Sequence, residues 1–579
     1  MTALSTYVLK HSLLILTILT LTVPVHAQIQ HRQLRKEVLE SQNPPPPANQ
    51  KQNRRGRLAP LPPVAPIRTP FDRRARIIYL ENADVIRFDQ LARPDIQVLT
   101  GRVRFRHEGA TLTCDSAYFN RATNSLDAFS NVRIVQGDTL FIYGDVLYYS
   151  GQTKMARLRG NVRLVNRKTT LSTDSLNYDR NTQLAYYFTG GKIVDPENTM
   201  TSVWGQYSTA SEDALFRNDV KLENKNFTMN SDTLKYNSKS HVAEIVGKTH
   251  IIYQDDTDIY TDRGWYNTNT ERSMLLNRSL IVDKEGKSLT GDTVFYDKSG
   301  QYGEAFGSVI LKDTVQKSTL YGHYIYYNED TELGIATDSA LLVDWSGDKH
   351  MYVHADTLKT YKDSIYNVAR AWLNVRFYRE DLQGITDSLR FSTRDSVIHL
   401  VNRPVVWQED QQLSGESIRV FTRNKTIDKV HIDQSAITSA RVDSLYFNQI
   451  GGKEIIAYID SGALVRVEVS GNAETVYFVI DDADSTLVGA NRTESSFVLM
   501  HFKDKKIDRI VLSAASSGVF YPIELTTDEV IYLTNFFWVE GMRPKSPTDV
   551  FTRYPAGERP KFFFSEEEFK EEEVKEEVK

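Results

Sequence analysis

The sequence predicts an all-β fold in which short strands stack into a long repetitive structure. Three observations lead to this prediction. A motif of the form Asp-x-apolar-x-aromatic recurs about every 30 residues between Asp115 and Asp443, and such a constant period is typical of stacked repeats. Tyrosine and phenylalanine are abundant, at 30 and 26 residues, whereas methionine is scarce at 8, a bias expected of strands. Helical periodicity is nearly absent before the last segment.

The first 75 residues are expected to lie outside this stack. Residues 1–27 resemble a signal peptide, because Lys10 and His11 precede a short apolar run that ends in Val25-His26-Ala27. Residues 28–75 hold nine of the chain's 18 prolines and an excess of Lys and Arg, so we predict a Pro-rich basic linker. An exported protein follows from this reading.

The repeated region is predicted to span residues 76–435. Each copy has a short strand opened by Gly or Asn, a Thr- and Leu-rich strand, a polar turn and a strand rich in small residues. Gly144, Gly291 and Gly322 fall beside the aspartate position, which predicts a bend or bulge there. Residues 436–555 keep strand character with less regular spacing, and we expect them to close the end of the stack. The clearest copies of the motif begin at Asp115, Asp145, Asp174, Asp232, Asp262, Asp292, Asp387 and Asp443.

Alternation at period two places the apolar residues of each strand on one face, which is predicted to face a long interior. These inward columns are the candidate binding residues, with an ordinary packed core as the alternative. The candidates for a lipid-binding groove are Val162, Leu164, Leu176, Tyr178, Leu234, Tyr236, Val294, Tyr296, Val309 and Leu311.

A search for catalytic chemistry finds no nucleophile elbow, phosphate-binding loop, zinc spacing or dinucleotide fingerprint. We therefore predict no enzyme, no cofactor and no metal site. The recurring aspartates are expected to cap turns by accepting hydrogen bonds from backbone N–H groups. A net charge of −5 gives no reason to expect nucleic-acid binding. The single cysteine, Cys114, is expected to be buried and structural.

The charged segments suggest solvated surfaces. Basic strand residues such as Arg102, Arg104 and Arg163 alternate outward, and contact with the phosphate groups of an amphiphile is the sharper alternative. Residues 556–579 are predicted to be an acidic disordered tail, because the stretch SEEEFKEEEVKEEVK (Ser565 to Lys579) is of low complexity.

The units GNVRLVNRKTTLSTDSLNYD (Gly160 to Asp179), GSVILKD…STLYG and VSGNAETVYFV resemble the OstA-like, or organic-solvent-tolerance, family. This family includes the periplasmic bridge protein of lipopolysaccharide transport and the amino-terminal domain of the outer-membrane lipopolysaccharide translocon. The resemblance runs from about residue 96 to 435, and the stretch around Phe536 and Arg543 resembles the long Bacteroidetes-type members. It implies an elongated open β-jellyroll, folded like a taco shell.

The resemblance also implies a function. We expect a non-enzymatic periplasmic carrier that shields the acyl chains of lipopolysaccharide on the way to the outer membrane. Its expected partners are lipopolysaccharide and other transport components, which join by end-to-end strand pairing and bring the chain to the outer or inner membrane. Two alternatives stay open: a rigid exported β-scaffold or adhesin-like stalk, and a carbohydrate-active β-helix enzyme.

Overall fold

The computed structural model describes residues 77–88, 94–254, 256–328, 330–423, 426–460, 463–480, 486–503 and 506–553. The predicted signal peptide (1–27), linker (28–75) and acidic tail (556–579) lie outside these residues. The described chain divides into two compact units. The N-terminal unit holds the described residues up to 196 together with 203–212, and the C-terminal unit holds 197–202 and the described residues from 213 onward.

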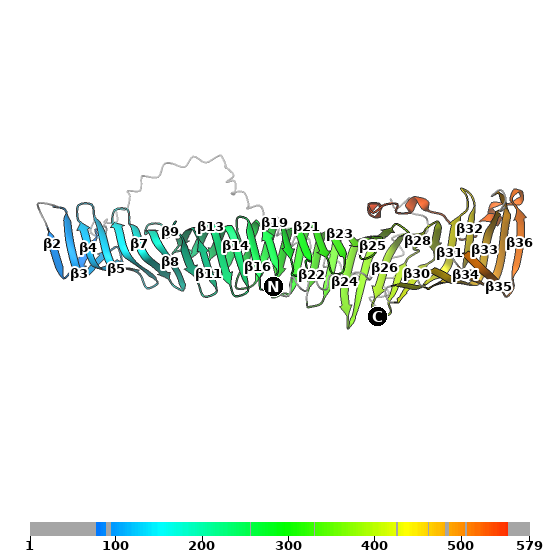
Figure 1. The fold of residues 1–579 in the computed structure, drawn as a ribbon, viewed down its shortest axis with the longest axis horizontal. Coiled ribbons are helices and arrows are strands. Elements are labelled where there is room, and N and C mark those ends of the chain that lie inside the picture. Colours follow the sequence, from blue (N-terminus) through cyan, green and yellow to red (C-terminus); the bar gives the residue numbers. More distant parts are fainter. Residues whose placement is uncertain are drawn as a thin grey trace, which may run out of the picture. The chain divides into compact units, whose positions relative to one another are not determined.

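The N-terminal unit is a ladder of antiparallel strands, each paired mainly with its neighbours in sequence (Figure 1). Its strands are β1 (Tyr79–Asn82), β2 (Val85–Phe88), β3 (Ile96–His107), β4 (Ala110–Asn120), β5 (Ser125–Gln136), β6 (Leu140–Ser150), β7 (Met155–Asn166), β8 (Thr169–Asp179), β9 (Leu184–Tyr187), β10 (Gly191–Val194) and β12 (Trp204–Ser208).

The C-terminal unit continues the same antiparallel pattern and adds short helical turns after its last strand. Its strands are β11 (Asn198–Ser202), β13 (Asp213–Asn224), β14 (Phe227–Asn237), β15 (Val242–Ile245), β16 (Thr249–Tyr253), β17 (Asp258–Thr261), β18 (Arg263–Asn267), β19 (Arg272–Val282), β20 (Ser288–Asp297), β21 (Tyr302–Asp313), β22 (Ser318–Asn328), β23 (Leu333–Asp344), β24 (Met351–Asp363), β25 (Tyr366–Arg379), β26 (Leu382–Ser392), β27 (Val397–Val401), β28 (Val405–Gln408), β29 (Gln411–Ser414), β30 (Ser417–Arg423), β31 (Thr426–Arg441), β32 (Phe447–Asp460), β33 (Ala463–Ile480), β34 (Leu487–Lys503), β35 (Lys506–Ser513) and β36 (Ser517–Pro522). The helical turns are η2 (Ile523–Leu525), α3 (Asp528–Ile531), η3 (Glu540–Met542) and η4 (Asp549–Phe551).

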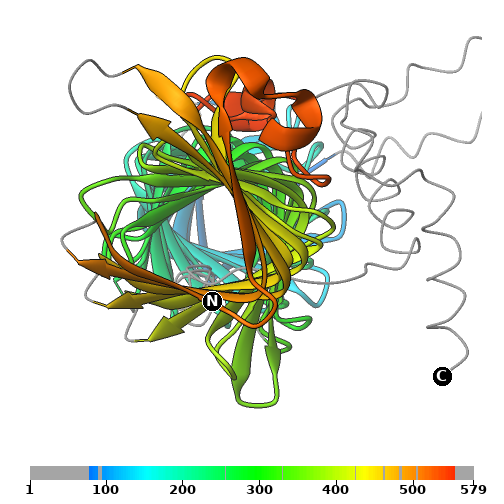
Figure 2. The same ribbon diagram turned by 90° about the vertical axis from the view of Figure 1, so that its right-hand side faces the viewer.

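Each unit is thus an all-β jellyroll of antiparallel strands, as the sequence predicts. Seen end-on, the strands of the C-terminal unit wrap around a common interior (Figure 2). The antiparallel pairing found throughout the described strands differs from the parallel coils that a carbohydrate-active β-helix would need.

Two-residue bulges bend the long strands near their middle. In β7, Gly160 and Asn161 both have positive φ, at 73° and 46°, and the register to the neighbouring strands skips these two residues. The same shift recurs in β3, β5, β13, β19, β21, β23, β25, β31 and β33. The small-residue strand and the Gly- or Asn-opened strand, which the sequence suggested were separate, are therefore one strand bent through a bulge.

Two of the recurring aspartates bind a neighbouring bulge rather than cap a turn, whereas Asp443 accepts a hydrogen bond from the backbone N–H of Ser444. Asp115 and Asp145 lie opposite bulges, where each accepts a 2.7 Å hydrogen bond from an asparagine Nδ2, of Asn131 and Asn161 respectively. At Gly160, a Cβ would lie 2.6 Å from the carboxylate of Asp145. Glycine therefore meets two demands here, a positive φ and close approach of the carboxylate. The aspartate stabilises the bend, because its carboxylate accepts a hydrogen bond from the asparagine side chain on the bulge.

The last described part of the segment 436–555, which we expect to close the stack, lies along the outer face of the C-terminal unit. We call residues 523–553 the C-terminal strap (orange to red in Figures 1 and 2). Its backbone is held by buried polar side chains of the sheet. Gln449 binds Ile531 O and Leu533 N, and Gln412 binds Phe537 O and Val539 N, at 2.7–3.0 Å.

The far end of the strap reaches β24 and β25. Arg376 donates to the carbonyl oxygens of Met542 and Asp549, at 3.0 and 3.2 Å. Phe551 packs on the buried ring of His354, with 4.6 Å between ring centroids, and Arg553 forms a 2.6 Å ion pair with Asp356. In the described part of the chain, no helix has the length and apolar character to cross a membrane.

Candidate functional site

The inward-facing columns form the interior of both units. All ten candidate groove residues are 3% exposed or less, so their inward orientation agrees with the sequence pattern. In the N-terminal unit, cross-strand partners such as Leu158 and Leu176, or Leu164 and Leu171, face each other directly and are fully buried. The interior there is filled by its own side chains.

The bends bring the two ends of the strands together, and polar contacts join these two rims in the N-terminal unit. Tyr149, near the end of β6, places its hydroxyl 2.6 Å from Nδ1 of His107, at the end of β3. Arg180 donates to the same hydroxyl at 2.8 Å and to Gln136 Oε1 at 3.2 Å. Lys154 and Glu108 form an ion pair at 2.5 Å. We call these contacts the rim bridges.

Each unit has further rim bridges. In the N-terminal unit, Asn166 donates to the hydroxyl of Tyr207 at 3.1 Å, and Arg167 forms an ion pair with Glu212. In the C-terminal unit, Asn198 donates to the hydroxyl of Tyr236 at 2.8 Å. Because these bonds are polar, parting the rims would expose groups that water can satisfy, which costs less than exposing apolar surface.

The interior is looser in the middle of the C-terminal unit. An apolar cavity of about 30 Å³ lies there, lined by residues of β21 to β25 that include Leu311, Ile325, Ala336, Leu358 and Ala369; Lys359 and Arg370 also contribute to the lining. Around 10–15 Å³ suffices for one water molecule, whereas sites for small-molecule ligands measure about 300–1,000 Å³. The cavity therefore gives slack to this part of the interior without holding an acyl chain.

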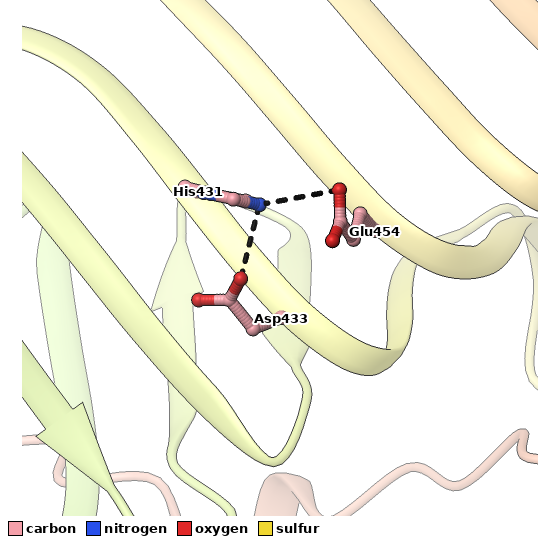
Figure 3. Close-up of side chains that lie close together, drawn as sticks. All are labelled: His431, Asp433 and Glu454. Atoms are coloured by element: carbon pink, nitrogen blue, oxygen red, sulfur yellow. Dashed lines mark ion pairs between the residues drawn. The ribbon is translucent and has the colours of Figure 1, made fainter.

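A cluster of possible metal ligands lies on the outer face of β31 and β32 in the C-terminal unit. His431 Nε2 lies 3.1 Å from Asp433 Oδ1 and 3.8 Å from Glu454 Oε2 (Figure 3). Their ligand atoms all lie within 4.8 Å of one another.

The surroundings of this cluster favour an ion-pair network. Arg419 donates to both carboxylate oxygens of Asp433 at 2.7 Å and to Nδ1 of His431 at 2.8 Å. An imidazole that accepts at Nδ1 carries its proton on Nε2, which then has no lone pair for a metal ion. Burial alone would raise the pKa of Asp433, but the hydrogen bond and the charge of Arg419 hold it below its usual value.

The terminal strands expose apolar side chains. β36 and β35 both pair with β34, and β1 and β2 both pair with β3. Ile510 and Phe520 are 50% and 48% exposed, and Ile86 and Phe88 are 54% and 49% exposed. An apolar terminal strand with free backbone groups favours strand addition by a partner.

Sequence reasoning found the inward columns but missed the rim bridges. The partners on opposite rims are 38 to 46 residues apart, as in Asn198 with Tyr236 and Lys154 with Glu108. A search for pairs of polar residues separated by about one and a half repeats could have found them. Residues with this separation lie at opposite ends of strands that stack close to one another.

Fold and interior together define a class of protein: β-jellyrolls of bent antiparallel strands, each with an apolar interior. Comparison with known proteins places part of the chain more closely. Residues 75–232 match the family model described as OstA-like protein. This match confirms the resemblance to the OstA-like family over these residues; the Bacteroidetes-type assignment stays a prediction.

Among solved structures, the chain is similar to LptH from Pseudomonas aeruginosa, described as the LptA homologous periplasmic component of the conserved lipopolysaccharide transport device. The two share 14% sequence identity with a TM-score of 0.16, and the likeness covers 17% of this chain and 76% of that one. No curated protein matches the sequence.

Proposed function

We propose that the protein is a non-enzymatic periplasmic bridge that shields the acyl chains of lipopolysaccharide during transport to the outer membrane. The observation that carries this proposal is an apolar interior, built from OstA-like repeats, that runs through each unit. Each exposed CH₂ group costs about 0.8 kcal/mol in water, so several acyl chains present a barrier of tens of kcal/mol. Similar rungs along the interior offer the chains sites of nearly equal affinity.

The acyl chains would enter by parting the two layers of the shell. The interior is packed, so a guest must displace side chains that now contact one another. The polar rim bridges suit this role, because their donors and acceptors can turn to water when the rims separate. The cavity lined by β21 to β25 leaves the interior room to yield there.

The ends of the stack would join other transport components by strand pairing. β36 is an exposed terminal strand on which Val519 and Phe520 are about half exposed. A proline at Val519 would remove one backbone donor from this strand. We expect V519P to lower the recovery of co-purifying transport components while the monomer stays folded; unchanged recovery would exclude this strand as the joint.

Site-specific photocrosslinking tests the carrier function. A photoreactive residue at Leu164, Leu234 or Leu311 should capture lipopolysaccharide in cells. The matched controls are the outward neighbours on the same strands, Arg163, Lys235 and Lys312, which should capture little. Thermal unfolding of each variant verifies the fold. If the inward positions of folded variants never capture lipopolysaccharide, the carrier function is wrong.

A rigid exported scaffold is the second candidate, and the packed interior of the N-terminal unit favours it. A scaffold needs a solid core and no guest. It predicts equal, low capture at inward and outward positions, so the same experiment separates the two functions.

A further inference from the structure

A row of basic side chains crosses the outer face of the C-terminal unit. Five adjacent strands place one basic residue each in direct cross-strand register. The row consists of Lys359 on β24, Arg370 on β25, Arg390 on β26, His399 on β27 and Arg419 on β30. Neighbouring strands lie about 4.8 Å apart, and like charges directly opposite each other are destabilising. The row is therefore a costly arrangement unless an anion covers it.

Three members of the row have no carboxylate to neutralise them. Among the described residues, no acidic side chain forms an ion pair with Lys359, Arg370 or Arg390, and Nε and Nη1 of Arg370 are buried without a hydrogen-bond partner. Burial lowers the pKa of Arg370 to about 10, and nearby Arg390 adds to this. Burial, followed by the charge of Arg370, lowers the pKa of Lys359.

The other groups facing the row do not balance it. Asp433 is bound to Arg419, and Asp356 is bound to Arg553 and Asn374. The pKa of His399 is lowered chiefly by burial, with Asp395 opposing and Arg390 and Arg419 adding to the shift. The side chain of Tyr361 is hydrogen-bonded to Arg370, and its ring lies 5.5 Å from both Lys359 and Arg370, so it supplies an aromatic face to both cations.

The C-terminal strap delivers the chain to this row. The ion pair of Arg553 with Asp356 fixes the last described residue on β24, three residues before Lys359. The stretch Ser565 to Lys579 carries eight glutamates and three lysines. The eleven residues between, 554–564, can span about 35 Å when extended. Lys359 lies about 10 Å along the strand, and the row extends about 19 Å across four strand spacings.

We propose that the acidic segment Ser565–Lys579 of the same chain docks on this basic row. Its glutamates neutralise Lys359, Arg370 and Arg390. This contact does not depend on lipid transport.

Zero-length carbodiimide cross-linking of the full chain tests the docking, because this reagent joins carboxylates to amines in direct contact. Mass spectrometry should find tail glutamates joined to Lys359. The yield should fall about tenfold in R370E/R390E and in 0.5 M salt, because exposed ion pairs are screened. The control K221E/K235E reverses two outward charges elsewhere in the same unit and should leave the yield unchanged.

Two further measurements keep the proposal falsifiable if R370E/R390E fails to fold. The single, exposed R390E should still lower the yield, and mixing isotopically labelled with unlabelled chains should give links within one chain. Cross-links between two copies of the chain would overturn the proposal. So would a yield of cross-links from the tail to Lys359 that is no higher than the yield to Lys235. A vesicle-binding comparison gives a second way to overturn it. If the full chain and a chain ending at Phe564 bind phosphatidylglycerol vesicles equally, and R390E weakens both equally, the tail does not cover the row.

Discussion

The two units are built from the same bent strands but hold their interiors differently. In the N-terminal unit, leucine faces leucine at zero exposure, and rim bridges such as Tyr149 with His107 join the strand ends. In the C-terminal unit, β21 to β25 surround a cavity, and the strap braces the outer face in addition to the rim bridge between Asn198 and Tyr236. The difference suggests that the strap supplies part of the stability of the C-terminal unit from outside, which leaves its interior freer to yield.

Core truncation should give the largest contrast between the units. Leu164→Ala removes a fully buried side chain from the tightly packed N-terminal interior, and we expect it to lower the free energy of unfolding by about 2–5 kcal/mol. Ala336→Val adds volume at the cavity of the C-terminal unit and should be neutral or stabilising by up to about 1 kcal/mol. Urea unfolding monitored separately in each unit measures both. Equal losses in the free energy of unfolding for the two variants would contradict a difference in packing between the units.

A pH effect should appear in the C-terminal unit. Burial raises the pKa of Glu304 from its usual 4.5 to about 7. The folded state then holds this proton more tightly than the unfolded chain, so the stabilisation is complete below pH 4.5 and is lost as the pH rises through 7. The loss amounts to roughly 3 kcal/mol. Urea midpoints between pH 4.5 and 8 should fall for the wild type but stay flat for E304Q, and parallel slopes would refute the assignment.

Loosening the rims should have a moderate and local effect. Tyr149→Phe removes the hydroxyl that meets His107 and Arg180, which should cost about 1–3 kcal/mol because buried partners lose a hydrogen bond. Hydrogen exchange should speed up at the turns beside these residues. Tyr148→Phe, on the outer face of the same strand, serves as the control and should leave exchange unchanged.

The smallest effect is expected at a bulge. Asn161→Ala deletes the hydrogen bond to Asp145 on the exposed outer surface, and we expect a cost of about 0.5–1 kcal/mol. The equivalent Asn374→Ala in the C-terminal unit removes the bond to Asp356 and should cost about the same. Thermal denaturation of both variants tests whether the bends, unlike the interiors, are equivalent in the two units.

The fold was predictable because a period of about 30 residues and strict alternation are local signals. The burial of Leu164 or Tyr178 followed from that alternation. The strap was not predictable, because Gln383, Gln412 and Gln449 look like ordinary outward residues until a distant segment covers them. The rim bridges and the basic row were missed for the same reason: they depend on which strands become neighbours, and on where a bulge shifts the register.

Locking the rims tests the central claim most directly. Glu108 and Lys154 face each other across the rims, so a cysteine at each position can be joined by a short bismaleimide. Cys114 is buried and burial raises the pKa of its thiol to about 12, so it should not react. With a photoreactive residue at Tyr178, we predict lipopolysaccharide capture before the rims are joined and its loss afterwards. Capture that continues undiminished in the joined protein would contradict entry of the acyl chains between the rims.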